Sequence, residues 1–144
     1  MSSVTYDTSA FIAYQPSLPR SDFLLSSVVL QELTAGATDK AGLRYWEAIY
    51  HRFKKEQKLL VPDDEDWWLA GKVLNALLRG LKSKAGGQTP KLPAAEKQRI
   101  IRDVLIARTA KRAGALLVTD NLDDFNLIRR FCAVPVISGA EYFG

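Results

Sequence analysis

Carboxylate side chains occur at four separated places in the sequence where they could act together. Asp7 follows the first apolar run, Glu32 lies in SVVLQELTAG, Asp103 lies in RIIRDVLIARTA, and a fourth group occupies positions 120–124. If the fold brings these acids together, they repel one another and their pKa values rise. A hard divalent cation such as Mg²⁺ or Mn²⁺ prefers oxygen ligands and removes that conflict. Such an ion can also lower the pKa of a water and neutralise the charge on a phosphate during hydrolysis.

Three of these four places also have an ordinary structural explanation. Asp7 could cap a helix that begins near Ser9, because aspartate is a favoured N-cap residue. Glu32 could be an exposed helical residue. The acids at 120–124 could be a helix cap followed by first-turn acids, which the helix dipole favours. Each explanation is reasonable when its acid is considered alone.

Asp103 is harder to explain as a structural residue. Its helical neighbours Ile100, Ala107 and Ala110 are packing residues, so Asp103 lies on or beside a buried face. An unpaired buried carboxylate costs roughly several kcal/mol. The ordinary partner would be Arg99, one turn earlier in the same helix. The small alanines would otherwise let this helix approach the sheet and carry Asp103 toward the strand ends.

The elements that position these acids are predicted from the periodicity of apolar residues. Strand patterns occupy 3–6, 58–62, 115–119 and 134–138, and the segment 22–33 changes from strand-like to helical. Helical patterns occupy 9–14, 40–53, 63–81, 93–112 and 120–131. This alternation predicts an α/β protein with a central parallel sheet between helices, in which ligands bind beyond the carboxyl ends of the strands. Asp7, Asp120 and Asn121 each follow a strand, so we expect them at the same edge of the sheet.

Composition limits the class of protein. The chain has 144 residues, of which 47% are hydrophobic and 25% charged, as expected for one globular domain over residues 1–144. A net charge of +4 permits a polyanionic partner, although solvated helix faces also explain the basic clusters. The single Cys132 and the single His51 cannot form a disulfide or a Cys–His zinc site. The start lacks a signal-peptide pattern and no apolar run approaches about 18 residues, so we expect a cytoplasmic protein without a membrane contact.

Four stretches in order resemble the PIN-domain family, and in particular the toxin of VapC-type toxin–antitoxin pairs. They are YDTSAFI, SSVVLQELTAGA, IIRDVLIARTAKRAGALLVTDNLDDF and VPVI, and together they span nearly the whole chain. The resemblance implies a single three-layer α/β/α (Rossmann-like) PIN domain. It also implies a Mg²⁺- or Mn²⁺-dependent endoribonuclease that hydrolyses RNA with a metal-activated water. A homodimer and a small cognate antitoxin protein are the implied partners.

The resemblance assigns site residues by position. Asp7, Glu32 and Asp103 match the first three family acids, with Glu32 either binding the metal or positioning the water. Hydroxyl groups close to the metal match Thr8 or Ser9, and Thr119. The basic residues that we expect near the RNA phosphates are Arg99 and Arg102.

The fourth acid is where this sequence departs from the family. In the family pattern T-x-[ND]-x-x-D-F the middle position is Asn121, so Asp120 or Asp124 could complete the site, and we favour Asp124. The expected catalytic acids are then Asp7, Glu32, Asp103 and Asp124, and the expected metal ligands are Asp7, Asp103, Asp120, Asn121 and Asp124. The same departure motivates an alternative, a non-catalytic RNA-binding or regulatory PIN-like domain.

Two further features have structural and functional interpretations. Segment 82–93, with paired glycines and two prolines, predicts a flexible surface loop, although a basic lip over a substrate groove is the alternative. Trp67 and Trp68 could stack on bases. We expect instead that Trp67 packs on the apolar stripe of its helix, and that Trp68 helps to cover a dimer or antitoxin surface.

Overall fold

The computed structural model describes residues 3–18, 20–88 and 92–144. Its strands form one three-stranded and one two-stranded parallel sheet, in the orders β1-β4-β5 and β2-β3. Their bounds are β1 Val4–Tyr6, β2 Leu25–Ser26, β3 Leu59–Leu60, β4 Leu116–Thr119 and β5 Val136–Ser138. The Val4 N–H donates to the Asp22 carbonyl, and the Leu24 N–H donates to the Val4 carbonyl, both at 2.9 Å. These bonds join the two sheets, so the strands follow one another in the order β3-β2-β1-β4-β5.

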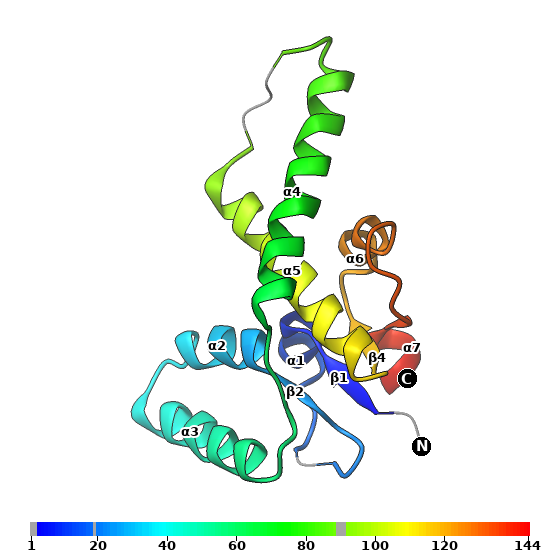
Figure 1. Ribbon diagram of the computed structural model, residues 1–144. Helices are drawn as coiled ribbons and strands as arrows, with labels where there is room; N and C mark the ends of the chain where they lie inside the picture. The colour runs from blue at the N-terminus through cyan, green and yellow to red at the C-terminus, as the bar shows by residue number, and fades with distance from the viewer. Residues whose placement is uncertain (1–2, 19, 89–91) are drawn as a thin grey trace.

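Helices connect the strands and cover both faces of the sheet (Figure 1). Their bounds are α1 Thr8–Tyr14, α2 Ser27–Ala35, α3 Lys40–Lys55, α4 Asp64–Lys84, α5 Ala94–Arg112, α6 Leu122–Ile128 and α7 Gly139–Phe143. Five of them begin at an Asp or Ser whose side chain accepts a backbone N–H of the first turn, namely Asp7, Ser26, Asp39, Asp63 and Ser138. Such caps satisfy N–H groups that the helix itself leaves unpaired.

The centre of the sheet is buried on both sides. Val4, Thr5 and Tyr6 are consecutive in β1 and all buried, although successive side chains of a strand point to opposite faces. The Tyr6 ring packs edge-on against Phe11 of α1 and Phe143 of α7, at centroid distances of 5.4 and 5.3 Å. Helix α5 packs against β2 and β4. The predicted α/β class with a central parallel sheet between helices is therefore confirmed.

Helices α4 and α5 form a long antiparallel pair that extends away from the sheet (Figure 1). Helix α4 continues to Lys84, so it occupies the first three positions of the segment 82–93 that was predicted to be a loop. Positions 89–91 of that segment lie outside the described residues. No helix in the described ranges has both the length and the apolar character that crossing a membrane requires.

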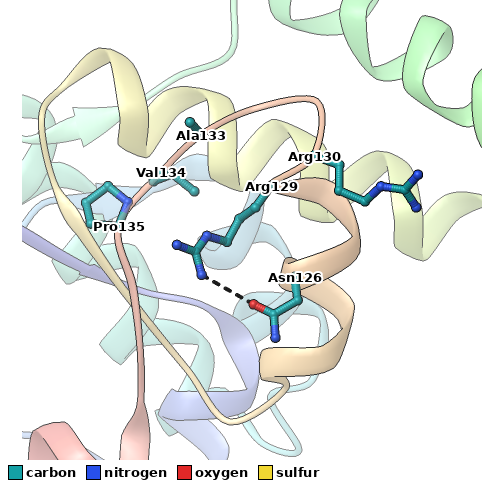
Figure 2. Close-up of a pocket in the computed structure, with 6 residues that line it drawn as sticks. All are labelled: Asn126, Arg129, Arg130, Ala133, Val134 and Pro135. Atoms are coloured by element: carbon teal, nitrogen blue, oxygen red, sulfur yellow. Dashed lines mark hydrogen bonds between the residues drawn. The ribbon is translucent and has the colours of Figure 1, made fainter.

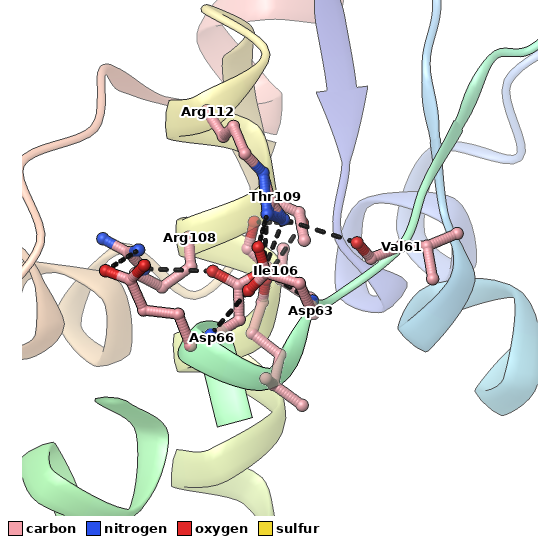
Figure 3. A network of polar contacts seen from close by, with 9 residues as sticks. Val61, Asp63, Asp66, Ile106, Arg108, Thr109 and Arg112 are labelled. Carbon is pink, nitrogen blue, oxygen red and sulfur yellow. Dashed lines mark hydrogen bonds and ion pairs between the residues drawn. The ribbon is translucent and has the colours of Figure 1, made fainter. Parts of the chain in front are cut away.

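An ion-pair network around the buried Asp66 ties the start of α4 to the end of α5 (Figure 3). Asp66 is fully buried, and its Oδ1 accepts from Arg108 Nε at 3.2 Å. Its Oδ2 accepts from Arg112 Nη1 at 2.9 Å and also contacts Nη2 of the same side chain. Asp63 and Asp66 form a reciprocal capping box, and Asp63 also accepts from Arg112 Nη1 at 3.0 Å. From the sequence alone, Asp66 is explained as an acid in the first turn of its helix, where the helix dipole favours negative charge.

The prediction that Trp67 packs on the apolar stripe of its helix is wrong. Trp67 is 57% exposed and the adjacent Trp68 is 65% exposed. The buried side chains of α4 are instead Asp66, Ala70 and Val73. Because Asp66 must face the arginines of α5, the residue after it is rotated about 100° around the helix and points away from that contact. Tertiary pairing of a polar residue thus determined which face of α4 is buried.

Candidate active site

Four carboxylates line one pocket at the carboxyl edge of the parallel strands. The pocket has a volume of about 240 Å³, and each acid comes from a different part of the chain. Asp7 follows β1, Glu32 lies in α2, Asp103 in α5 and Asp124 in α6. In the same pocket lie Thr8, Ser9, Asn121, Arg99 and Arg102, all of which the sequence analysis had selected. The fold therefore brings together acids that are separated by up to 117 positions in the chain.

Asp7 serves as a helix cap and also contributes to the pocket. Its Oδ1 accepts from the Ala10 N–H at 3.0 Å and from Ser9 Oγ at 2.7 Å. Its Oδ2 accepts from Thr119 Oγ1 at 2.6 Å. Burial raises the pKa of Asp7, whereas the hydrogen bonds from Thr119, Ser9 and Ala10 act to lower it. Both sequence interpretations of this residue, a cap and a pocket carboxylate, therefore describe the same side chain.

Two hydroxyl groups connect Asp7 to the turn after β4. Ser9 Oγ accepts from the Asp120 N–H at 3.0 Å, and Thr119 Oγ1 accepts from the Asn121 N–H at 2.9 Å. Each hydroxyl therefore accepts from this turn and donates to Asp7. This arrangement fixes the first acid relative to the turn that carries the fourth, and it accounts for a serine and a threonine at these two positions.

Glu32 is held by groups on two other helices. Its Oε1 accepts from Thr8 Oγ1 at 3.0 Å, and its Oε2 lies 3.6 Å from Arg102 Nε. Each of the three hydroxyls that were predicted near the metal thus donates to a carboxylate of the pocket. Thr8 donates to Glu32, and Ser9 and Thr119 donate to Asp7.

Asp103 and Asp124 share one arginine. Arg99 Nη1 lies 2.9 Å from Asp124 Oδ2 and 3.4 Å from Asp103 Oδ2, while Nη2 of the same side chain lies 2.7 Å from Glu96 Oε2. Burial raises the pKa of Asp103 to about 7; Arg99 opposes the rise, and the charges of Asp124, Asp7 and Glu32 add to it. The ordinary partner that the sequence offered for Asp103 is present, but it does not offset the burial of this carboxyl.

The acids of the 120–124 run point in different directions. Asp124 and Asn121 line the pocket. Asp120 is exposed, does not line the pocket, and accepts a hydrogen bond from Tyr14 Oη at 3.1 Å. Asp123 is exposed as well. The geometry favours Asp124 over Asp120 as the fourth acid, and their roles as metal ligands stay predictions.

The pocket offers the donor chemistry of a hard cation, but not a preassembled metal centre. Its ligands are carboxylate, amide and hydroxyl oxygens, which suit Mg²⁺ or Mn²⁺. Within the described ranges, no three acidic, histidine or cysteine side chains lie close enough to hold an ion as they stand. The Arg99 guanidinium instead provides positive charge between Asp103 and Asp124.

A basic concavity lies where the chain leads into β5 (Figure 2). It has a volume of about 560 Å³ and is lined by the end of α6 and the segment that leads into β5. Arg129 Nη1 donates there to Asn126 Oδ1 at 3.3 Å. Val134 and Pro135 precede β5, whereas the four acids follow strands or lie on the helices beside the strand ends. This concavity is therefore separate from the acid-lined pocket.

Solved structures with a similar fold include chains of VapBC and FitAB. No family model matches the chain, and no curated protein has a significant match. The chain is similar to a chain of DNA-bound VapBC from Salmonella typhimurium, with 23% identity, a TM-score of 0.53, and coverage of 96% of this chain and 99% of that one. A chain of VapBC-1 from nontypeable Haemophilus influenzae has 18% identity and a TM-score of 0.54, with coverage of 95% of this chain and 98% of that one. A chain of FitAB bound to a DNA fragment has 17% identity and a TM-score of 0.53, with coverage of 94% of each chain. The fold that the sequence resemblance predicted is thereby confirmed.

Proposed function

We propose that this chain is the nuclease component of a VapC-type toxin–antitoxin pair and hydrolyses RNA with the help of Mg²⁺ or Mn²⁺. The observation that carries this proposal is the convergence of Asp7, Glu32, Asp103 and Asp124 on one pocket at the carboxyl edge of a PIN-type sheet. Four like charges in one pocket are unfavourable unless a cation or protons compensate them. A structural role does not require such a cluster, whereas phosphodiester hydrolysis assisted by a cation uses it directly.

The residues of the pocket divide the work. Asp7, Asp103 and Asp124 would hold the ion through carboxylate oxygens, with Asn121 as a neutral oxygen donor. The ion supplies a water of lowered pKa and positive charge for the phosphate oxygens. Glu32, whose Oε1 is held by Thr8, would orient the attacking water. Ser9 and Thr119 hold Asp7 in place, and the hydrogen bonds that they donate act against the rise of its pKa.

Arg99 and Arg102 are the groups that would bind the substrate phosphates. Both line the acid pocket and are about one-third exposed, with 34% and 37% of their side-chain surface accessible. Arginine binds phosphate through paired, charge-assisted hydrogen bonds. A divalent ion held by Asp103 and Asp124 would compete with Arg99 for these carboxylates, which would leave the guanidinium available for a phosphate.

The test is cleavage of a panel of labelled single-stranded RNAs by the purified protein. We expect cleavage with Mg²⁺ or Mn²⁺, no cleavage with excess EDTA, and its loss in Asp103→Asn. Asp123→Asn is the matched control, because it removes an exposed acid that does not line the pocket. Equal cleavage by the wild-type protein and by Asp103→Asn would contradict the assignment.

A non-catalytic RNA-binding domain is the second candidate function. The pairing of Arg99 with both Asp103 and Asp124 favours it, because an internal cation already compensates part of the charge. Calorimetric titration with Mg²⁺ and Mn²⁺ distinguishes the two functions. A domain without measurable affinity for either ion, but with salt-sensitive RNA binding, would support this second function and contradict the first.

We further propose that a small antitoxin binds this chain. The similar solved structures are named as VapBC and FitAB complexes. An apolar groove of about 750 Å³ between α2 and α3 offers a surface for an amphipathic helix, with Leu30, Leu43, Trp46 and Tyr50 in its lining. Leu43 is 48% exposed at this groove. Co-expression with a small protein encoded next to this chain's gene tests the proposal, and we expect a complex that Leu43→Glu disrupts and that Arg44→Glu does not. Equal yields with both variants would contradict this location.

A further inference from the structure

A second pocket lies beside the acid pocket, and residues of α2 and α5 line both of them. It has a volume of about 490 Å³ and is lined by α2, the start of α4, and α5. Ile101 and Leu105 of α5 contribute apolar surface, and Gln31 and Gln98 contribute amides. Arg102 lines both pockets, and Gln31 is adjacent in sequence to Glu32 of the acid pocket. A bound molecule could therefore occupy both pockets at once.

Trp67 lines this second pocket, and its exposed indole has no packing role there. Its indole is 57% exposed at the base of α4, although a tryptophan usually buries most of its surface. The adjacent Trp68 does not line the pocket, and its ring lies 5.2 Å from Lys72 Nζ. The two tryptophans therefore have different surroundings, and only Trp67 presents an aromatic ring to a concavity next to the acids.

The polar groups of this pocket match the edge of a nucleobase. A primary amide carries both a donor and an acceptor, as the hydrogen-bonding edges of bases do. The side-chain amides of Gln31 and Gln98 line the pocket, and among the described residues no side-chain hydrogen bond to another residue engages them. An aromatic ring, an apolar floor and free amides together suit a flat heterocycle with a polar edge. Proteins that read single-stranded RNA use the same groups, stacking bases on aromatic rings and binding their exposed edges.

We propose that Trp67, Gln31, Gln98 and Arg102 form a binding subsite for one base of a single-stranded RNA, next to the phosphate that is cleaved. The inference rests on the proposed nuclease function, because that function places a phosphate in the acid pocket. Arg102 Nε lies 3.6 Å from Glu32 Oε2, so its guanidinium stands between the acids and the second pocket. In this position the Arg102 guanidinium can bind the phosphate that links the nucleotide at the cleavage site to the nucleotide whose base stacks on Trp67. The subsite would select the base beside the cleaved bond.

Binding is measured in the Asp103→Asn background with EDTA, so that the RNA is not cut. Short single-stranded RNAs that differ at one position are titrated against Trp67→Ala, Trp67→Phe and Trp68→Ala. We expect Trp67→Ala to weaken binding roughly tenfold to a hundredfold, as for the loss of one stacked base. Trp67→Phe should restore most of the affinity, and Trp68→Ala should leave it within about twofold. An abasic nucleotide at the subsite position should remove the difference between the wild-type tryptophan and alanine.

The outcomes separate this inference from the proposed nuclease function. Cleavage by the wild-type protein, with equal effects of Trp67→Ala and Trp68→Ala on binding, overturns the subsite and leaves the nuclease intact. Absence of cleavage, with binding that depends on Trp67 and on the base, overturns the nuclease and supports a base-binding pocket. A shift of Trp67→Ala to a smaller species in light scattering, without loss of RNA affinity, overturns the subsite in favour of a protein interface. Circular dichroism of each variant establishes that it is folded.

Discussion

Helix α5 carries two acid–arginine clusters that differ in how well their charges are paired. Near its carboxyl end, Arg108 and Arg112 bind Asp66, whose side chain is fully buried and accepts from both guanidinium groups. Near its amino end, Arg99 contacts Asp103 and Asp124 in a pocket that also contains Asp7 and Glu32. The cluster around Asp66 has more arginines than buried acids, whereas the acid pocket has more acids than arginines.

We propose that this difference separates a structural cluster from the candidate functional one. At Asp66 each carboxylate oxygen has an arginine partner, and the capping box adds the Asp63 N–H at 3.0 Å, so no group is left to bind a ligand. At Asp103 burial is only partly offset, and the pKa of this carboxyl rises to about 7. Ionisable groups with shifted pKa values are concentrated in active sites, where a bound ligand supplies the charge partner that the fold does not. Burial of an acid is therefore less informative than the balance of charge around it.

The largest expected effect is the loss of activity in Asp103→Asn. We expect RNA cleavage to fall roughly 10³-fold or more, about 4 kcal/mol of activation free energy, because the amide cannot replace a carboxylate at the cation. Single-turnover cleavage measures this directly. Asp66→Asn should retain the wild-type rate per folded molecule, since Asp66 lies in the structural cluster. If Asp66→Asn lost activity as severely while remaining folded, the separation of the two clusters would be wrong.

Asp66→Asn should instead reduce the free energy of unfolding by about 3 kcal/mol, because two arginines lose their buried partner. Denaturant unfolding at pH 7 measures the change. Asp64→Asn is the matched control, since Asp64 is an exposed acid in the first turn of the same helix and should alter stability by less than about 1 kcal/mol. Similar midpoints for the two variants would show that burial of Asp66 contributes no special stability.

The stability of the metal-free protein should decrease between about pH 4 and pH 7. The pKa of Asp103 is raised in the folded state to about 7 from an ordinary value of 3.8, so the folded state binds this proton more tightly than the unfolded state. Stability from this group is complete below the unfolded pKa and is lost as the pH rises through 7. In EDTA, the free energy of unfolding of the wild-type protein should fall by about 2 kcal/mol between pH 5 and pH 8 because of this group. Asp103→Asn should not show this fall. Identical pH profiles for the two proteins would contradict this account.

The smallest expected effect concerns Arg99. Because its side chain is 34% exposed, Arg99→Gln should lower the stability of the metal-free protein by no more than about 1 kcal/mol. Affinity for Mg²⁺ or Mn²⁺ should rise about threefold to tenfold in calorimetry, because the ion no longer competes with a guanidinium. Lys97→Gln, an exposed charge on the same helix, controls for net charge. Equal affinities for the two variants would exclude direct competition by Arg99.

Much of the candidate site was predictable because its residues follow recognisable local patterns. Asp7 and Asn121 come directly after strands, and Asp103 interrupts a run of apolar helical residues. The choice between Asp120 and Asp124 was not decided by any local pattern. It depends on the rotation of helix α6 and on the hydrogen bond from Tyr14 to Asp120, contacts between segments more than 100 residues apart.

The roles of Asp66 and Trp67 could not be deduced from their own helix. An aspartate at the third position of α4 is explained by capping and by the helix dipole, so nothing local required it to be buried. The signal that could have been used is the Asp63–Asp66 spacing together with arginines one turn apart at 108 and 112. Once those pairs form, Trp67 is rotated about 100° around α4 from Asp66, and its indole is left largely exposed.

The sequence by itself determined the order of strands and helices along the chain and indicated which acids could lie together, because periodicity, capping and residue chemistry act over short distances. The divalent ion that these oxygen ligands would favour stays a prediction. Only the tertiary structure decided how the charges are paired. Arg99 and Arg102 lie among the acids, Arg108 and Arg112 surround Asp66, and Trp67 stands beside a pocket that Arg102 shares with the acids. The physical reason is that electrostatic compensation and burial depend on distances in space, which segments far apart in the chain establish only when they pack.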